Sequence, residues 1–138
     1  MKVLVDTSVW SLTLRRRLER LSVEQHRISE ELSELVREHR VVMVGPVRQE
    51  LLSGVKVQRT FERLRQALRA FPDEALTTQD FEEAARANNR CRAAGVAGSA
   101  IDFLLCAVAL RRSLAIFSTD RDFERYARHL QFPLYHLR

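Results

Sequence analysis

The sequence has few of the residues that form disulfide frameworks and zinc sites. Among its 138 residues are two cysteines, Cys91 and Cys106, and four histidines. Two cysteines are too few for a disulfide framework, so we expect both to be reduced and buried in a cytoplasmic protein. The histidines form neither an HxxxH nor an HExxH pattern, and a zinc site is therefore not expected.

Long apolar runs and linker segments are missing as well. No apolar run approaches the roughly 20 residues that a membrane-spanning helix needs, so we expect no membrane association. The first residues carry no apolar signal region, which also favours a cytoplasmic protein. No internal repeat and no segment rich in proline and glycine divides the chain, so we expect a single domain over residues 1–138.

Several catalytic motifs are absent. No GxSxG elbow or Ser/His/Asp order supports covalent acyl transfer. Neither GxxxxGK[ST] nor GxGxxG is present, which disfavours nucleotide binding by a phosphate loop. The net charge of +5 suits a polyanionic partner, and it suits solvated, arginine-rich helix faces equally well. Charge alone does not choose between these two interpretations.

Short apolar runs alternate with amphipathic segments along the whole chain. Strands are predicted at 2–5, 41–44, 114–117 and 133–137, with a weak short one at 74–78. Helices are predicted near 8–17, 22–40, 46–53, 57–70, from about 77, at 100–110 and at 120–130. Capping boxes are expected from Ser22 with Gln25 and from Thr77 with Asp80, Pro46 suits a first helical turn, and Tyr126 is expected to face inward. Alternating strands and helices predict an α/β three-layer sandwich, with a mainly parallel central sheet flanked by helices.

Four acidic residues follow the predicted strands or begin the helices after them. Asp6 directly follows the first strand, and Asp120 comes three residues after the strand at 114–117. Glu50 lies in the helix after the second strand, and Asp102 lies in the first turn of an otherwise apolar helix. Because ligands bind at the carboxyl ends of parallel strands, we expect these four carboxylates to lie at one edge of the sheet.

Each carboxylate also has a structural interpretation. Asp6 and Asp120 are suitable N-caps, Asp102 completes a capping box with Ser99, and Glu50 suits a solvent-exposed position. Taken together, four clustered carboxylates would repel one another unless a cation were bound between them. Hard ions such as Mg²⁺ and Mn²⁺ prefer carboxylate oxygen, and they promote phosphodiester hydrolysis without a protein nucleophile.

Four motifs in order resemble the PIN-domain ribonucleases, and within them the VapC-type toxins of prokaryotic toxin–antitoxin pairs. The motifs are VLVDTSVW, VGPVRQELLSG, GSAIDFLLCAVAL and FSTDRDFERYA, which together span essentially the whole chain. The resemblance implies an acidic quartet that binds Mg²⁺ or Mn²⁺, with a serine and a further carboxylate as possible additions. In this sequence the quartet is Asp6, Glu50, Asp102 and Asp120, and the additions are Ser118 and Asp122.

The resemblance also implies an activity and partners. It implies a cytoplasmic endoribonuclease that cleaves structured RNA, such as transfer or ribosomal RNA, and so arrests translation. The expected partners are the RNA substrate and a small VapB-like antitoxin, in a homodimer or a toxin–antitoxin hetero-oligomer. Arg15, Arg16 and Arg17 lie near the predicted edge of the site and are candidate phosphate contacts.

Three alternatives remain at this point. The chain could be a non-cleaving PIN-fold module that binds RNA or a partner, although an intact acidic quartet argues against this. A nuclease that cleaves DNA would use the same metal chemistry. A phosphoaspartate protein is disfavoured because a DxD phosphatase needs an aspartate where Ser8 stands.

Overall fold

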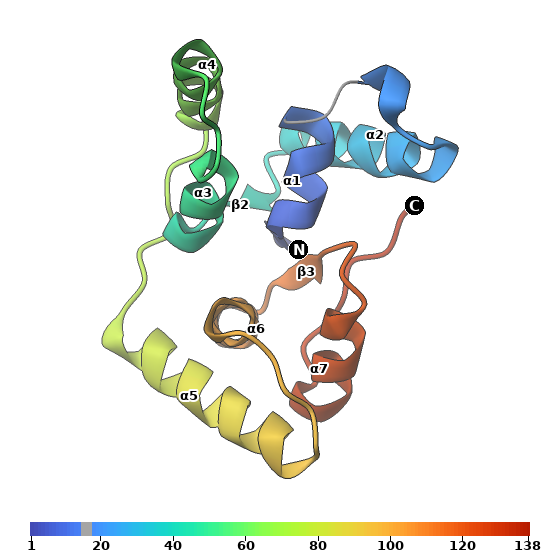
Figure 1. Ribbon diagram of the computed structural model, residues 1–138. Coiled ribbons are helices and arrows are strands. Elements are labelled where there is room, and N and C mark those ends of the chain that lie inside the picture. Colours follow the sequence, from blue (N-terminus) through green and yellow to red (C-terminus); the bar gives the residue numbers. More distant parts are fainter. Residues whose placement is uncertain (15–17) are drawn as a thin grey trace.

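The computed structural model describes residues 1–14 and 18–138 (Figure 1). The expected phosphate contacts Arg15, Arg16 and Arg17 lie outside the described residues. In chain order the elements are β1 (Val3–Val5), α1 (Thr7–Leu14), a 3-10 turn η1 (Leu18–Arg20), α2 (Val23–Arg37), β2 (Val41–Val42), α3 (Gly45–Leu52), α4 (Gln58–Leu68), α5 (Thr78–Ala93), α6 (Ala100–Arg112), β3 (Ala115–Phe117) and α7 (Asp122–Leu130).

The three strands form one parallel sheet in the order β2–β1–β3. On one side of β1, Val3 pairs with Val41 of β2. On the other side, Val3 pairs with Ala115 and Val5 with Phe117 of β3. Every residue of β1 and β3 is buried, as in parallel strands that are covered on both faces. The predicted α/β sandwich is therefore confirmed.

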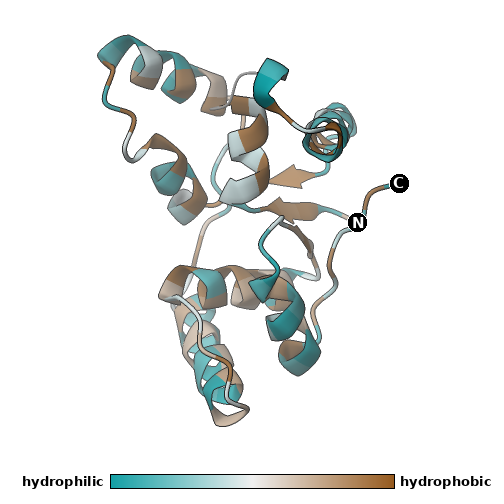
Figure 2. Cartoon of the chain, turned by 45° about the vertical axis from the view of Figure 1, so that its right-hand side comes forward, coloured by the Kyte–Doolittle hydropathy of each residue, from teal (hydrophilic) through white to brown (hydrophobic). Residues whose placement is uncertain are grey.

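Helices cover both faces of the sheet. Helices α1 to α4 lie on one face and α5 to α7 on the other, with the hydrophobic strands between them (Figures 1 and 2). The chain passes from β1 to β2 on one side and later returns to β3 on the other side of β1. In open parallel sheets such a reversal marks the ligand site, here at the carboxyl ends of β1 and β3.

Local sequence signals determine where several helices begin. Ser22 and Gln25 form the predicted capping box of α2, and the backbone N–H of Gln25 donates to Ser22 Oγ at 3.1 Å. Thr77 and Asp80 form the second predicted box, at the start of α5. Pro46 lies in the first turn of α3, where its missing N–H removes no helical hydrogen bond. These three predictions are confirmed.

The predicted strand at 74–78 is wrong. The nearest strand-like pairing is one isolated bridge between Met43 and Asp73, just before this segment. The backbone N–H of Thr77 donates to the Asp80 carboxylate at 2.7 Å, and the carbonyl of Ala75 accepts from Arg112 at 2.8 Å. Because side chains satisfy these backbone groups, the groups do not pair with a neighbouring strand, and the segment does not join the sheet.

The predicted strand at 133–137 is also wrong, since it makes a single bridge between Ile116 and Leu134. The chain then turns toward α2, where the Tyr135 hydroxyl and the Arg138 guanidinium both contact Glu31. The second strand is shorter than predicted, ending at Val42. Helix ends differ from the predictions by a few residues, which is common where helices fray.

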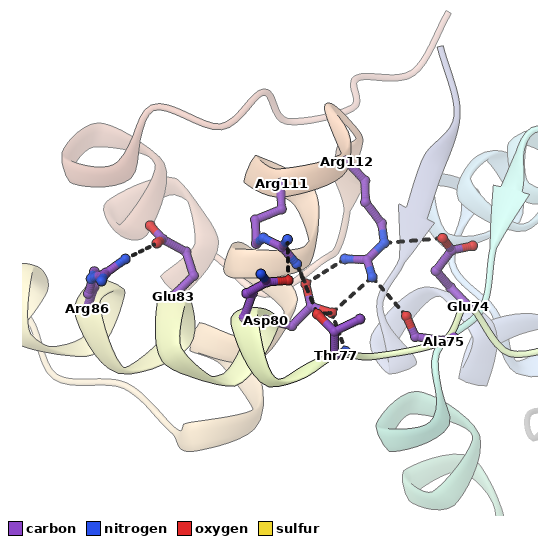
Figure 3. Close-up of polar contacts among 9 residues, drawn as sticks. Glu74, Ala75, Thr77, Asp80, Glu83, Arg86, Arg111 and Arg112 are labelled. Carbon is purple, nitrogen blue, oxygen red and sulfur yellow. Dashed lines mark hydrogen bonds and ion pairs between the residues drawn. The ribbon is translucent and has the colours of Figure 1, made fainter.

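One end of α6 is fixed to α5 by the buried Asp80 (Figure 3). Its Oδ1 accepts from Nη1 of Arg111 at 2.5 Å and from Nη1 of Arg112 at 2.7 Å. Its Oδ2 accepts from Nη2 of Arg112 at 2.9 Å. Arg112 also pairs with Glu74 at 3.1 Å. This network holds α6 in place, and the other end of that helix carries Asp102.

Both cysteines are buried and unpaired, as predicted. Burial raises the pKa of the Cys106 thiol far above its usual value, so this cysteine stays protonated and unreactive. Within the ranges that the structure describes, the helices are too short or too polar to cross a bilayer.

Candidate metal centre

The carboxylate of Asp6, at the end of β1, is held by two serine hydroxyls. Its Oδ2 accepts from Ser8 Oγ at 2.7 Å and from Ser118 Oγ at 2.8 Å. Ser118 directly follows β3, so this bond joins the carboxyl ends of two neighbouring strands. The backbone N–H of Asp6 continues the sheet by donating to the carbonyl of Phe117 at 2.9 Å. The sheet and the two hydroxyls together orient this carboxylate.

Three further carboxylates gather beside α6 and α7. Asp102 lies in the first turn of α6, Asp120 lies in the loop after β3, and Asp122 begins α7. Each offers one oxygen, and these oxygens all lie within 4.8 Å of one another. Asp102 and Asp120 were predicted as ligands and Asp122 as a possible extra ligand, and the structure brings all three together.

The environment of Asp102 disfavours its negative charge. Burial raises the pKa of this carboxyl above its usual value, and the charges of Asp6 and Asp120 raise it further. A hydrogen bond from the Tyr126 hydroxyl to Asp102 Oδ2, at 2.9 Å, acts in the opposite direction. A cation bound between these carboxylates would remove the repulsion that the fold leaves in place.

The structural interpretation of these aspartates holds only in part, because Arg121 and not Asp120 is the N-cap of α7, and Ser99 caps α6 without the reciprocal bond of a capping box. Asp120 Oδ1 accepts from the backbone N–H of Asp122 at 2.9 Å, which satisfies a free donor at the start of α7. Ser99 Oγ accepts from the backbone N–H of Asp102 at 3.0 Å and caps α6. Asp122 also pairs with Arg125 at 2.5 Å, in an exposed contact that contributes little to stability.

Glu50 lies apart from the group of three close carboxylates. It is exposed near the end of α3, and its oxygens are not among those within 4.8 Å of one another. Asp6 also lies outside that group, although its charge acts on Asp102. Metal binding by Glu50 stays a prediction that rests on the family resemblance.

Three residues that shape this site were not predicted from the sequence. Ser8 was expected only to begin a helix, yet its hydroxyl holds Asp6. Tyr126 was expected to pack inward, which it does at 0% exposure, and its hydroxyl also reaches Asp102. Gly98 lies against the Tyr126 ring, where an added Cβ would come within 2.8 Å of Cζ. Neither contact of Tyr126 has a signal in the local sequence.

The donor atoms fit a hard divalent cation. Asp102, Asp120 and Asp122 offer only carboxylate oxygen, which suits Mg²⁺ or Mn²⁺ better than zinc or copper. Within residues 1–14 and 18–138, no ion pair engages the half-buried Asp102, whose pKa is raised by burial and by acidic neighbours. These three residues therefore fit a divalent-metal centre, whereas the full predicted quartet stays a prediction.

Comparison with known proteins places the chain in a family. The model of the PIN domain family matches residues 3–129. The chain is 33% identical over 132 residues to VapC ribonuclease Mb1587 of Mycobacterium bovis and, equally, to ribonuclease VapC11 of Mycobacterium tuberculosis. Each alignment covers 91% of this chain and 92% of the relative.

Two solved structures share the fold. FitAcB from Neisseria gonorrhoeae superposes with a TM-score of 0.75 at 19% identity, over 97% of this chain and 96% of that one. FitAB bound to an IR36 DNA fragment gives a TM-score of 0.73 at 19% identity, over 99% and 97% of the two chains. With the acidic site at the carboxyl ends of its strands, the chain belongs to the PIN-domain family, and within it to the VapC type.

Proposed function

We propose that this protein is a Mg²⁺- or Mn²⁺-dependent endoribonuclease, the toxin of a type II toxin–antitoxin pair. Its substrate would be structured RNA such as transfer or ribosomal RNA, and cleavage would arrest translation. The proposal rests above all on the group of Asp102, Asp120 and Asp122 beside the end of β1. It is supported by VapC relatives that are named as ribonucleases.

The proposed metal ligands are acidic residues from several elements of the fold. Asp102 and Asp120 would bind it directly, together with Asp6 from the neighbouring strand, and Asp122 is a further candidate ligand. Glu50, near the end of α3, is retained as a candidate ligand from the family resemblance. A bound divalent ion would supply a Lewis acid that activates water and stabilises the charge that develops on the phosphodiester.

The remaining residues orient the ligands. Ser8 and Ser118 fix the rotation of the Asp6 carboxylate, because both donate to the same oxygen. This leaves the other oxygen, Oδ1, available to a cation. Tyr126 holds Oδ2 of Asp102 in the same way. Such outer hydrogen bonds typically change metal affinity or activity by about 10- to 100-fold when they are removed.

The proposed partners follow from the VapC relatives. We propose a small VapB-like antitoxin as the inhibitor, with the toxin in a homodimer or a toxin–antitoxin hetero-oligomer in the cytoplasm. The apolar faces of α2 and α4 would be candidate clamps for the antitoxin if they were exposed. In the structure these faces contribute buried leucines to the core, namely Leu32, Leu35, Leu64 and Leu68.

The test is cleavage of total cellular RNA by the purified protein with Mg²⁺, with Mn²⁺ and with EDTA. An Asp102→Asn variant purified in parallel controls for contaminating nucleases. We expect discrete fragments that require metal and that decrease at least about a hundredfold in the variant, because the metal contributes several kcal/mol to the transition state.

Equal cleavage by both proteins would contradict the assignment of Asp102. If metal-loaded protein free of antitoxin bound RNA without cutting it, the non-cleaving PIN-fold module would replace the ribonuclease as the best interpretation. A parallel reaction with single- and double-stranded DNA separates a ribonuclease from a nuclease that cleaves DNA.

A further inference from the structure

A groove of about 680 Å³ runs beside the metal centre. It lies between α1, the start of α2, the loop after β3 and the C-terminal segment, on the side of the sheet where the C-terminus lies near α2 (Figure 1). Its lining includes Ser8 and Ser118, which hold the Asp6 carboxylate. A smaller hollow lined by Asp120 shares Ser118 and Arg121 with it. The groove therefore begins at the two serines that hold Asp6, and it adjoins the hollow that Asp120 lines.

The floor of the groove is apolar. Leu12 and Phe117 are buried, each 4% exposed, and Ile28 and Leu137 are half-buried beside them. An apolar floor of this kind suits a flat ring system with little polarity on its faces. The volume falls within the range of about 300–1,000 Å³ that is typical of small-ligand sites.

The rim toward α2 carries hydrogen-bonding groups that are not fully used. Gln25 Oε1 accepts a hydrogen bond from the backbone N–H of Ser22 at 3.0 Å, and the amide Nε2 of Gln25 remains available as a donor. Among the described residues, neither the Glu24 carboxylate nor the Ser11 hydroxyl has a hydrogen-bond partner. The rim thus offers an acceptor and donors above an apolar floor.

Charges of both signs line the other side. Arg121 and His136 are exposed, and across residues 1–14 and 18–138 no ion pair engages Arg121. Glu24 and Glu124 line the same groove. This mixture does not suit a continuous phosphate track, which would be uniformly basic. It suits a single nucleotide, with the phosphate near Arg121 and the base near the carboxylates.

We propose that the groove binds one unpaired nucleotide next to the cleaved phosphodiester and that it reads a base bearing an amino group. The base would lie on the Leu12–Phe117 floor, with its amino group donating to Glu24 and a ring acceptor receiving the Gln25 amide. Arg121 and His136 would contact the adjoining phosphate. The base must be unpaired because a duplex hides the edge that Glu24 and Gln25 would contact. This inference rests on the proposed ribonuclease activity.

The test maps cleavage positions in a pool of RNA hairpins with randomised loops. Glu24→Gln removes the acceptor charge, and Gln25→Glu removes the amide donor while keeping the capping box with Ser22. Glu30→Gln is the matched control, since it changes an exposed glutamate of the same helix that lies outside the groove. Thermal unfolding of all three variants confirms that they fold.

We expect the unaltered protein to prefer particular bases at one position beside the cut. Glu24→Gln and Gln25→Glu should each reduce that preference about fivefold or more, because a good base-edge contact contributes about 1–3 kcal/mol of discrimination. Glu30→Gln should leave it unchanged. An identical base preference in all four proteins would overturn the inference while leaving the ribonuclease activity established.

A second readout keeps the two proposals separate if the protein does not cut RNA. That result would overturn the proposed function, and the groove would then be judged by the binding of hairpins with an open loop and of matched, fully paired RNA. Tighter binding of the open loop that is lost in Glu24→Gln would support the groove. Equal affinity for both RNAs in the unaltered protein would overturn it.

Discussion

An aspartate side chain is shielded from bulk water near each end of α6, Asp80 of α5 at one end and Asp102 of α6 itself at the other. The two carboxylates differ in whether a positive charge lies beside them. At the C-terminal end, Asp80 is fully buried and is paired with Arg111 and Arg112. At the N-terminal end, Asp102 lies among other aspartates. The same residue type therefore serves as a structural tie at one end of the helix and as a binding group at the other.

The pKa values of the two carboxyls are consequently shifted in opposite directions. Hydrogen bonds from Arg112 hold the pKa of Asp80 well below its usual value of 3.8. Burial raises the pKa of Asp102 above the same value. A charge that the fold has already balanced contributes to stability, whereas a charge that it has left unbalanced is available to a ligand.

The largest effect on stability is expected at the balanced end. Asp80→Asn should destabilise the protein by about 3 kcal/mol, because it leaves two arginines without their buried partner. Glu83→Gln is the matched control on the same helix, since its ion pair with Arg86 is exposed and should be worth less than about 1 kcal/mol (Figure 3). Urea unfolding measures both, and equal losses would contradict the distinction.

At the unbalanced end, metal should stabilise the fold. We expect Mn²⁺ at a hundred times its dissociation constant to add about 2.7 kcal/mol to the free energy of unfolding. In Asp102→Asn the same concentration should add much less, because a ligand is lost and repulsion is relieved. Thermal unfolding with and without Mn²⁺ measures this difference. A full metal-induced shift in the variant would show that the ion binds elsewhere.

Tyr126 links the packing of α7 to the metal site. Tyr126→Phe removes the hydroxyl that donates to Asp102 Oδ2 and keeps the ring packed against Phe103 and Phe123. We expect metal affinity to fall about tenfold with little change in metal-free stability. Gly98→Ala should weaken metal binding too, because its Cβ would displace the Tyr126 ring. Unchanged metal affinity in both variants would show that Tyr126 does not contribute to metal binding.

The smallest expected effect concerns pH without metal. Because the folded pKa of Asp102 is raised, its contribution to stability is present below the unfolded pKa and is lost as pH rises through the folded pKa. Asp80 behaves in the opposite way, since its contribution is lost only as pH falls below 3.8. Metal-free Asp102→Asn should therefore be more stable than the unaltered protein at pH 7, and this advantage should vanish in acid.

The layered fold was predictable because its signals are local. Buried apolar runs mark the three strands, and capping pairs such as Ser22 with Gln25 mark helix starts. The strand at 74–78 failed because the side chains of Asp80 and Arg112 satisfy its backbone groups. The strand at 133–137 failed because it makes a single bridge to β3. The sequence also did not indicate which face of α5 packs against the core, since Ala87 and Cys91 are buried while the larger Phe81 is 55% exposed.

The site was predictable only in part. Asp6, Asp102 and Asp120 follow from the rule that ligands bind at the carboxyl ends of parallel strands. The hydroxyls of Ser8 and Tyr126 did not follow from it, because a hydroxyl near a strand end or in a helix has no pattern that reveals its tertiary partner. The arginine pair on Asp80 was missed for the same reason, since the partners are more than 30 residues apart.

The most direct test of the account is a Mn²⁺ titration of the metal-free protein at pH 7, followed by electron paramagnetic resonance. The account predicts saturable binding that Mg²⁺ displaces, that weakens strongly in Asp102→Asn and Asp120→Asn, and that persists in Glu83→Gln. Binding of the same strength in all four proteins would contradict the assignment of the metal to the aspartates beside α6 and α7.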